Sequence, residues 1–135
     1  MQWNAQHNAG FTNGTPWLDV PDVYRSINVE AEERDPDSIL NYYRLLVRLR
    51  KEYPIIADGG IRFLETDNDR VFSYERTLDG QRLVVVCNFS GKQERASVSC
   101  TTGKMIASNG AQSPLDRVQD GVLELLPYEA FAVLC

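Results

Sequence analysis

The residues that decide the fold class lie in the middle of the chain, where positions 71–89 read VFSYERTLDGQRLVVVCNF. Two runs rich in β-branched and aromatic residues flank Asp79-Gly80, a dipeptide that favours the tight turn of a β-hairpin. The second run, Leu83–Cys87, is continuously apolar, which is typical of a central strand covered on both faces. This stretch therefore predicts an antiparallel hairpin with one strand near the centre of a sheet.

The same kind of pattern extends on both sides of this hairpin, from about Gly59 onward. Asp120-Gly121 predicts a second hairpin, and Arg95–Cys100 alternates, with Ala96, Val98 and Cys100 on one face. The sequence predicts strands at Ile61–Glu65, Val71–Arg76, Arg82–Phe89, Arg95–Cys100, Lys104–Ser108, Val122–Leu126 and Tyr128–Leu134. Short strands with turns every 8–12 residues or so indicate a mainly β fold, an antiparallel β-sandwich.

One strong amphipathic helix is predicted before the strands, over residues 35–53. Asp35 suits the N-cap, Pro36 suits the first helical position, and Pro54 is expected to end the helix. Its apolar residues cover an arc of roughly 220°, whereas a helix packed on one side needs a stripe of about 100°. We therefore expect two packing partners, the domain that follows and a second one that is not obvious in this chain.

Residues 1–34 show no sustained periodicity and are rich in Asn, Gly, Thr, Pro and aromatic residues, so we expect a long ordered loop. Such long loops are uncommon, and are usually functional or disordered. Disorder fits poorly with Trp3, Phe11 and Trp17, which it would leave in water. Because sugar rings stack well on aromatic faces, these residues suit a sugar-binding rim. The alternative is that they pack the loop onto a neighbouring surface, which we favour for Trp17, while for Trp3 the two interpretations are closer.

Length and charge exclude several classes of protein. A (β/α)8 barrel needs about 250 residues, so a chain of 135 residues does not hold one. The net charge of −5 comes without a basic patch, which argues against nucleic acid as a partner. No apolar run approaches the roughly 20 residues of a membrane span, and the first residues lack a signal-peptide pattern. A cytoplasmic protein without membrane contact is the expectation.

The cysteines do not predict a metal site. Cys87, Cys100 and Cys135 are odd in number and widely spaced, and the chain has a single histidine. A zinc site or a disulfide framework is therefore not expected. We expect three reduced cysteines that pack as small hydrophobic residues, and no metal or cofactor.

No catalytic residue is predicted either. Nucleophilic catalysis of the Ser/Cys-His type needs a base, and the only histidine, His7, is expected to be an exposed loop residue. Glycoside hydrolysis needs two carboxylates about 5–10 Å apart across a sugar ring. The acidic runs Glu30–Glu33 and Asp67–Asp69 are instead expected to be solvated.

Several sequence blocks, taken in order, resemble the oligo-1,6-glucosidase, dextran glucosidase and trehalose-6-phosphate hydrolase branch of the alpha-amylase superfamily (glycoside hydrolase family 13). The blocks are Met1-Gln2-Trp3, Asn8-Ala9-Gly10-Phe11-Thr12, Gly14-Thr15-Pro16-Trp17, Asp37–Tyr43, Val84–Ser90 and Leu126-Pro127-Tyr128-Glu129-Ala130. The resemblance implies that residues 1–57 are the end of a (β/α)8 barrel, with a rim loop over 1–34 and the last barrel helix over 35–53. It implies that residues 58–135 are the C-terminal sandwich.

The family likeness also implies a function. Members hydrolyse α-glucosidic bonds with retention, using an aspartate nucleophile, a glutamate acid/base and a second aspartate. In the family all three precede the position of Met1, so this chain alone is expected to be inactive and to serve a structural role. Met1, Gln2, Trp3 and Phe11 are the candidate substrate-rim residues.

The expected partners follow from the same likeness. They are the enzyme's own catalytic barrel and a short α-gluco-oligosaccharide. The isolated chain is expected to self-associate through Tyr42, Tyr43 and Leu46, because large exposed apolar patches are rarely left bare. The alternatives are a self-standing sandwich module that binds α-glucan, or a purely structural or interaction domain.

Overall fold

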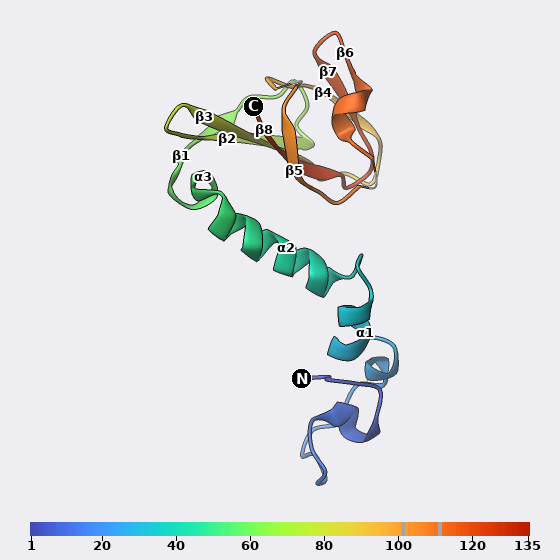
Figure 1. Ribbon diagram of the computed structural model, residues 1–135. Coiled ribbons are helices and arrows are strands. Elements are labelled where there is room, and N and C mark those ends of the chain that lie inside the picture. Colours follow the sequence, from blue (N-terminus) through green and yellow to red (C-terminus); the bar gives the residue numbers. More distant parts are fainter. Residues whose placement is uncertain (101, 111) are drawn as a thin grey trace. The chain divides into compact units, whose positions relative to one another are not determined.

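The computed structural model describes residues 1–100, 102–110 and 112–135, which form two compact units, Met1–Arg48 and Leu49–Cys135 (Figure 1). The helical elements are η1 (His7–Gly10), η2 (Asp22–Arg25), α1 (Val29–Arg34), α2 (Ile39–Glu52), α3 (Pro54–Asp58) and η3 (Pro114–Arg117). The strands are β1 (Gly60–Leu64), β2 (Val71–Leu78), β3 (Gln81–Asn88), β4 (Glu94–Ser97), β5 (Lys104–Ser108), β6 (Val118–Gln119), β7 (Val122–Leu125) and β8 (Ala130–Leu134).

The second unit is the predicted antiparallel β-sandwich. One sheet has the strand order β1-β2-β3-β8-β5 and the other has the order β4-β7-β6. Val84, Val86 and Val133 of the first sheet form one buried core with Ala96 and Leu123 of the second. Burial of apolar side chains between the two inner faces is what holds such a sandwich together. The predicted fold class is confirmed.

Both predicted hairpins are present, and their turns explain why. Asp79 and Gly80 join β2 to β3 with φ of 48° and 78°, and Asp120 and Gly121 join β6 to β7 with φ of 51° and 78°. Two successive left-handed residues make a type I′ turn, whose twist matches that of the flanking strands. Asp and Gly are among the residues that adopt this conformation most readily.

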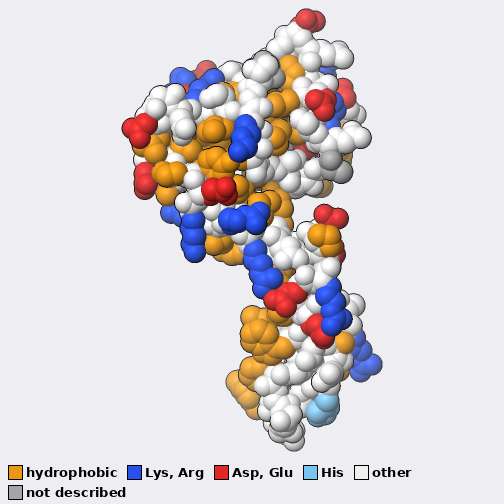
Figure 2. Space-filling model, viewed as in Figure 1, with side chains coloured by type: hydrophobic (Ala, Val, Ile, Leu, Met, Phe, Trp, Pro, Cys, Tyr) orange, Lys and Arg blue, Asp and Glu red, His pale blue; other side chains and the backbone are white. Residues whose placement is uncertain are grey.

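Strand β3 lies inside its sheet, between β2 and β8, but its two faces differ from the prediction. Leu83, Val84 and Val86 are buried, whereas Val85 and Cys87 are only half-buried. The second sheet covers one face of β3, and nothing in the described residues covers the other to the same extent. Figure 2 shows hydrophobic side chains at the surface of both units.

An exposed aromatic cluster lies on the outer side of the first sheet. The ring of Phe72 on β2 contacts those of Phe63 and Phe89, with centroid separations of 5.7 and 6.3 Å. Phe63 and Phe89 are 67% and 71% exposed. This sheet therefore keeps an apolar outer surface in addition to its buried inner one.

The predicted helix over 35–53 begins later than expected, at Ile39. Ser38 is the N-cap, because its hydroxyl accepts a hydrogen bond from the Asn41 N–H at 3.2 Å. Asp35 is unavailable as N-cap because it ends the preceding helix, its N–H donating to the Ala31 carbonyl at 3.2 Å. Pro54 does not simply end α2 but occupies the first turn of α3.

The segment predicted as a loop without regular structure contains η1, η2 and the six-residue helix α1. A helix of fewer than two turns shows too little periodicity to be recognised from its pattern. Asn28 caps α1, because its side chain accepts from the Ala31 N–H at 2.9 Å. At the other end, the Asn41 amide donates to the carbonyls of Glu32 and Asp35 at 2.9 and 2.7 Å.

The expectation of three reduced cysteines is wrong. Cys100 and Cys135 form a disulfide across 35 residues of sequence, with their Cα atoms 6.3 Å apart, and Cys87 alone is free among the described cysteines. Sequence spacing cannot reveal this pairing, because it depends on the fold bringing the residue after β8 beside the segment that follows β4. Among the described residues, no helix combines the length and the apolar character needed to cross a membrane.

Candidate substrate-rim site

The first unit contains a pocket of about 500 Å³, which we call the rim pocket. It is lined by Met1, Gln2, Asn8, Ala9, Phe11 and the run Pro16–Pro21. Three of the four candidate rim residues, Met1, Gln2 and Phe11, thus come together around one cavity. The fourth, Trp3, does not line this cavity, whereas Trp17 does.

A left-handed turn shapes the wall of the rim pocket. Asn8, Ala9 and Gly10 have successive φ values of 54°, 55° and 66°. Three consecutive residues in this region are unusual, and such backbone strain persists only where the surroundings enforce it. The Asn8 side chain contributes by donating hydrogen bonds to the carbonyls of Thr12 and Gly14 at 3.1 and 2.8 Å.

The chain start is fixed to helix α1 by its backbone. The N–H groups of Val29 and Glu30, in the first turn of α1, donate to the carbonyls of Gln2 and Trp3 at 3.0 and 2.9 Å. The first N–H groups of a helix have no hydrogen-bond partner within the helix. These two bonds therefore give partners to two such N–H groups of α1 and to two backbone carbonyls near the chain start. Gln2 is thereby held at the edge of the rim pocket.

The two tryptophans differ in their surroundings. Trp17 is 92% exposed and lines the pocket, whereas Trp3 is 48% exposed and lies outside it. Within the described residues, Trp17 is therefore not packed onto a neighbouring surface. Phe11, at 63% exposure, presents a second aromatic face to the same pocket.

The rim pocket combines aromatic and polar groups. Its described lining holds aromatic rings, the amides of Gln2 and Asn8, and a single carboxylate, Asp19. Retaining hydrolysis of a glycoside needs two carboxyl groups about 5–5.5 Å apart. The lining of this pocket therefore suits stacking on a sugar and hydrogen bonding to its hydroxyl groups. His7 is an exposed residue at the start of η1, as expected.

Several acidic residues outside the pocket have structural partners. Glu30 and Glu33 pair with Arg34 and Arg44 on the surface of the first unit. Asp67 is exposed, as expected, and it also accepts hydrogen bonds from the Ser97 N–H and hydroxyl, both at 3.0 Å. The Ser97 backbone bond, followed by the hydroxyl bond, lowers the pKa of Asp67 below its usual value.

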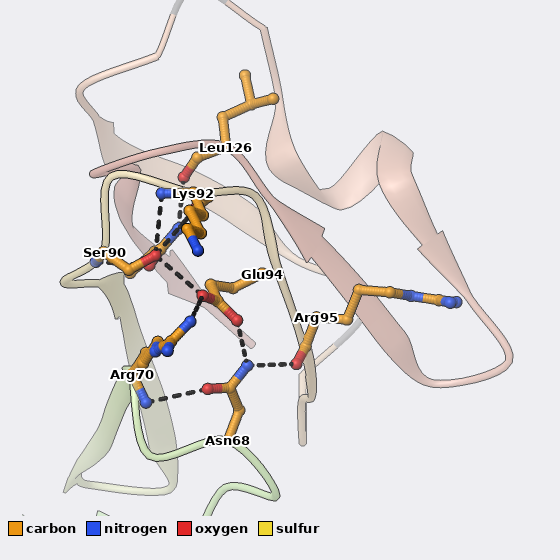
Figure 3. A network of polar contacts seen from close by, with 8 residues as sticks. Asn68, Arg70, Ser90, Lys92, Glu94, Arg95 and Leu126 are labelled. Carbon is orange, nitrogen blue, oxygen red and sulfur yellow. Dashed lines mark hydrogen bonds and ion pairs between the residues drawn. The ribbon is translucent and has the colours of Figure 1, made fainter.

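Glu94 is the centre of a polar network that joins β4 to the loops before β2 and after β3 (Figure 3). It accepts from the Asn68 amide at 2.8 Å, from Arg70 at 3.1 Å and from the Ser90 hydroxyl at 3.0 Å. The Asn68 bond is the largest cause of a lowered pKa of Glu94, followed by the bonds from Arg70 and Ser90. With its two oxygens bonded in this way, Glu94 connects the two sheets of the sandwich.

Two further carboxylates, which sequence reasoning missed, are buried among arginines. Glu75 accepts from Arg62 and Arg82 at 2.8 and 2.6 Å, and Glu129 pairs with Arg117 and accepts from the Leu126 N–H at 2.9 Å. The Arg82 bond, followed by that of Arg62, lowers the pKa of Glu75. The alternation of β2 did not indicate burial of Glu75, because the aromatic residues Phe72 and Tyr74 fall on the opposite face of the strand.

Comparisons with known proteins match this architecture. Residues 1–59 match the family model described as "Alpha amylase, catalytic domain", and residues 61–131 match "Maltogenic Amylase, C-terminal domain". The chain belongs to the alpha-amylase superfamily. Its relatives in that superfamily include an oligo-1,6-glucosidase of Halalkalibacterium halodurans, 39% identical over 96% of this chain, and a probable oligo-1,6-glucosidase 2 of Bacillus subtilis, 41% identical over 96%.

Solved structures of the alpha-amylase superfamily agree. The trehalose-6-phosphate hydrolase of Bacillus licheniformis matches 98% of this chain with a TM-score of 0.83 and 34% identity. This chain spans 24% and 23% of the lengths of the two glucosidases, and 24% of the hydrolase. It corresponds to a C-terminal part of the α-glucosidases of glycoside hydrolase family 13.

Proposed function

We propose that this chain is the non-catalytic C-terminal part of a retaining α-glucosidase that hydrolyses α-1,6 or α-1,4 bonds in short oligosaccharides. The rim pocket carries the proposal: Met1, Gln2, Phe11 and Trp17 line it, with Asp19 as its one carboxylate among the described residues. The printed names of the relatives, oligo-1,6-glucosidases, supply the reaction class. The catalytic aspartate and glutamate would come from the remainder of the enzyme.

The proposed role of the rim pocket is to bind and orient the sugar. The exposed faces of Phe11 and Trp17 offer rigid apolar area for a pyranose ring. The Gln2 amide can both donate to and accept from a sugar hydroxyl. The left-handed turn at Asn8–Gly10 would hold this wall in place, so that little freedom is lost on binding.

The proposed role of the rest of the chain is structural. Helix α2 exposes Ile39, Tyr43, Leu46 and Val47, at 84%, 66%, 40% and 41% of their surface. Side chains of this kind on one helix need a partner, and we propose the enzyme's own catalytic barrel. In the isolated chain, Tyr42, Tyr43 and Leu46 would instead contact a second copy.

Two assays test the proposal. The purified 135-residue chain should release no glucose from isomaltose or maltose under conditions where the Bacillus subtilis relative is active. Turnover by the chain alone would contradict its non-catalytic role. A chimera in which this chain replaces the matching last part of that relative should be active, and the truncated relative should not. A folded but inactive chimera would count against the proposed structural role.

The exposure of Trp17 favours a second candidate function, a self-standing module that binds α-glucan. Fluorescence titration with isomaltose and maltose distinguishes it from the first. The module predicts saturable binding that Trp17→Ala abolishes and that Trp3→Ala, outside the pocket, leaves intact. Absence of binding at millimolar sugar removes this candidate.

The proposal includes the cytoplasm as the place of action, as the sequence led us to expect. Fractionation of the source cells followed by immunodetection tests this point. Recovery with cytoplasmic marker proteins supports it, and recovery from the medium or an extracytoplasmic fraction contradicts it.

A further inference from the structure

A disulfide links Cys135, which follows β8, to Cys100 in the core of the sandwich. Cys100 is 5% exposed and belongs to the core cluster, whereas Cys135, which follows β8, is exposed. The bond between them is the one disulfide among the described residues. The third cysteine, Cys87 on β3, is unpaired and provides an internal reference thiol.

Arg82 reinforces the same junction. Its carbonyl accepts from the Cys135 N–H at 2.8 Å, and its guanidinium donates to the Ser99 carbonyl at 3.1 Å and to the Ser99 hydroxyl. Glu75 holds this guanidinium from the other side. The residue before Cys100 and Cys135 itself are therefore already positioned against β3 by polar contacts, independently of the sulfur bond.

The closed loop includes much of the sandwich. Between Cys100 and Cys135 lie β5, β6, β7 and β8, which are two strands of each sheet. Cross-linking the ends of such a segment restricts the unfolded chain and raises the stability of the folded one. Opening the bond should therefore weaken the whole sandwich rather than one loop.

We propose that Cys100 and Cys135 form a redox clasp, whose opening and closing by thiol–disulfide exchange sets the stability of the sandwich. A dithiol reductant attacks the sulfur of Cys135, the more accessible partner, and Cys100 leaves as a thiolate that takes up a proton. The second thiol of the reductant then displaces Cys135, which is protonated in turn. The reductant loses two electrons and leaves as its own disulfide.

The reverse reaction closes the clasp at the expense of a disulfide oxidant. An excess of dithiol reductant would open the pair, and an oxidising shift would close it. This inference does not depend on the proposed glucosidase function. It concerns the stability of the sandwich and is read out without any sugar.

The test equilibrates the purified full chain with mixtures of oxidised and reduced dithiothreitol. Alkylation and mass spectrometry then count free thiols, while circular dichroism follows thermal unfolding of the same samples. We expect one alkylated cysteine in the oxidised state and three in the reduced state. The melting temperature should fall on reduction by on the order of 10 °C, the shift expected for a disulfide of ordinary strength in a domain of this size.

Two variants serve as matched controls. Cys87→Ser should keep the full shift in melting temperature, and Cys135→Ser should melt at the reduced value in both conditions. Three alkylated cysteines under oxidising conditions would overturn the inference, as would equal melting temperatures in samples whose thiol counts differ. If Cys135→Ser does not fold, the paired thiol counts and melting temperatures of the unaltered chain decide the matter.

Discussion

The backbone N–H of Trp3 donates a hydrogen bond to the carbonyl of Ala9 at 2.8 Å, within the opening segment of residues 1–34. Ala9 is buried and has a φ of 55°, so its carbonyl direction depends on a left-handed backbone that alanine adopts only at a cost. The Asn4 N–H donates to the same carbonyl at 3.2 Å. The shape of the rim pocket thus rests on the backbone of a few residues.

Gly10→Ala is expected to loosen this loop. A Cβ on Gly10 would lie 2.6 Å from the Asn4 side chain, at a φ of +66° that disfavours alanine by about 1 kcal/mol or more. Hydrogen exchange at the Trp3 and Asn4 amides should become faster. Gly14→Ala is the matched control, because its Cβ would meet only the Thr12 hydroxyl at 3.7 Å. Equal protection in the two variants would contradict the assigned role of the turn.

Glu129→Gln is expected to destabilise the sandwich by about 3 kcal/mol. The Glu129 side chain is 2% exposed and pairs with Arg117, so removing its charge leaves a largely buried guanidinium without its counter-charge. Urea unfolding followed by circular dichroism measures the change. Asp116→Asn makes the same chemical change at an exposed neighbouring position and should alter the unfolding free energy little. If both variants lose similar amounts of unfolding free energy, the buried Glu129–Arg117 pair contributes no more to stability than an exposed carboxylate does.

Acid should weaken the sandwich in part through Glu75. Hydrogen bonds from Arg82 and Arg62 lower the pKa of Glu75 below its ordinary value of 4.5. A carboxyl whose pKa is lower in the folded state stabilises the fold above pH 4.5, and this contribution is lost as pH falls through the folded value. The difference in urea midpoint between the unaltered chain and Glu75→Gln should therefore shrink as the pH falls from 7 toward 3. A constant difference across that range would refute the assignment.

Leu46→Glu should reduce self-association of the isolated chain. Leu46 is 40% exposed on α2, and a charge there would oppose burial against a second copy. Sedimentation velocity should show dimers or larger species for the unaltered chain and a shift toward monomer for the variant. Arg48→Glu also introduces a glutamate, but about 200° away around the helix, and should leave association unchanged. A monomeric unaltered chain at high concentration would contradict the proposed apolar contact.

The sandwich was predictable because its signals are local. The Asp-Gly turns specify two hairpins, and the alternation of Ala96, Val98 and Cys100 assigns the inner face at β4 and just after it. The two-residue strand β6 was missed because it is too short to carry a pattern, and the start of α2 was misplaced because Asp35 and Ser38 are both good caps. The Cys100–Cys135 bond was missed because it depends on tertiary proximity alone.

The candidate site was predictable only in part. The aromatic composition of the opening loop singled out Trp3, Phe11 and Trp17, but packing onto a neighbouring surface was favoured for Trp17. The family likeness added Met1 and Gln2. Trp17 lines the pocket and Trp3 does not, and the pocket wall includes left-handed residues at Asn8 and Ala9. An alanine or an asparagine in a sequence does not reliably predict a left-handed backbone. The outline of the pocket could therefore not be derived from residue types.

The most direct test of the central claim is to sequence the genomic DNA immediately upstream of the codon for Met1. If the chain is the C-terminal part of an α-glucosidase, the reading frame should continue upstream in frame. It should encode the strands and helices of a (β/α)8 barrel, including the aspartate and glutamate of the proposed catalytic pair. An in-frame stop codon followed by a ribosome-binding site just before Met1 would contradict that account.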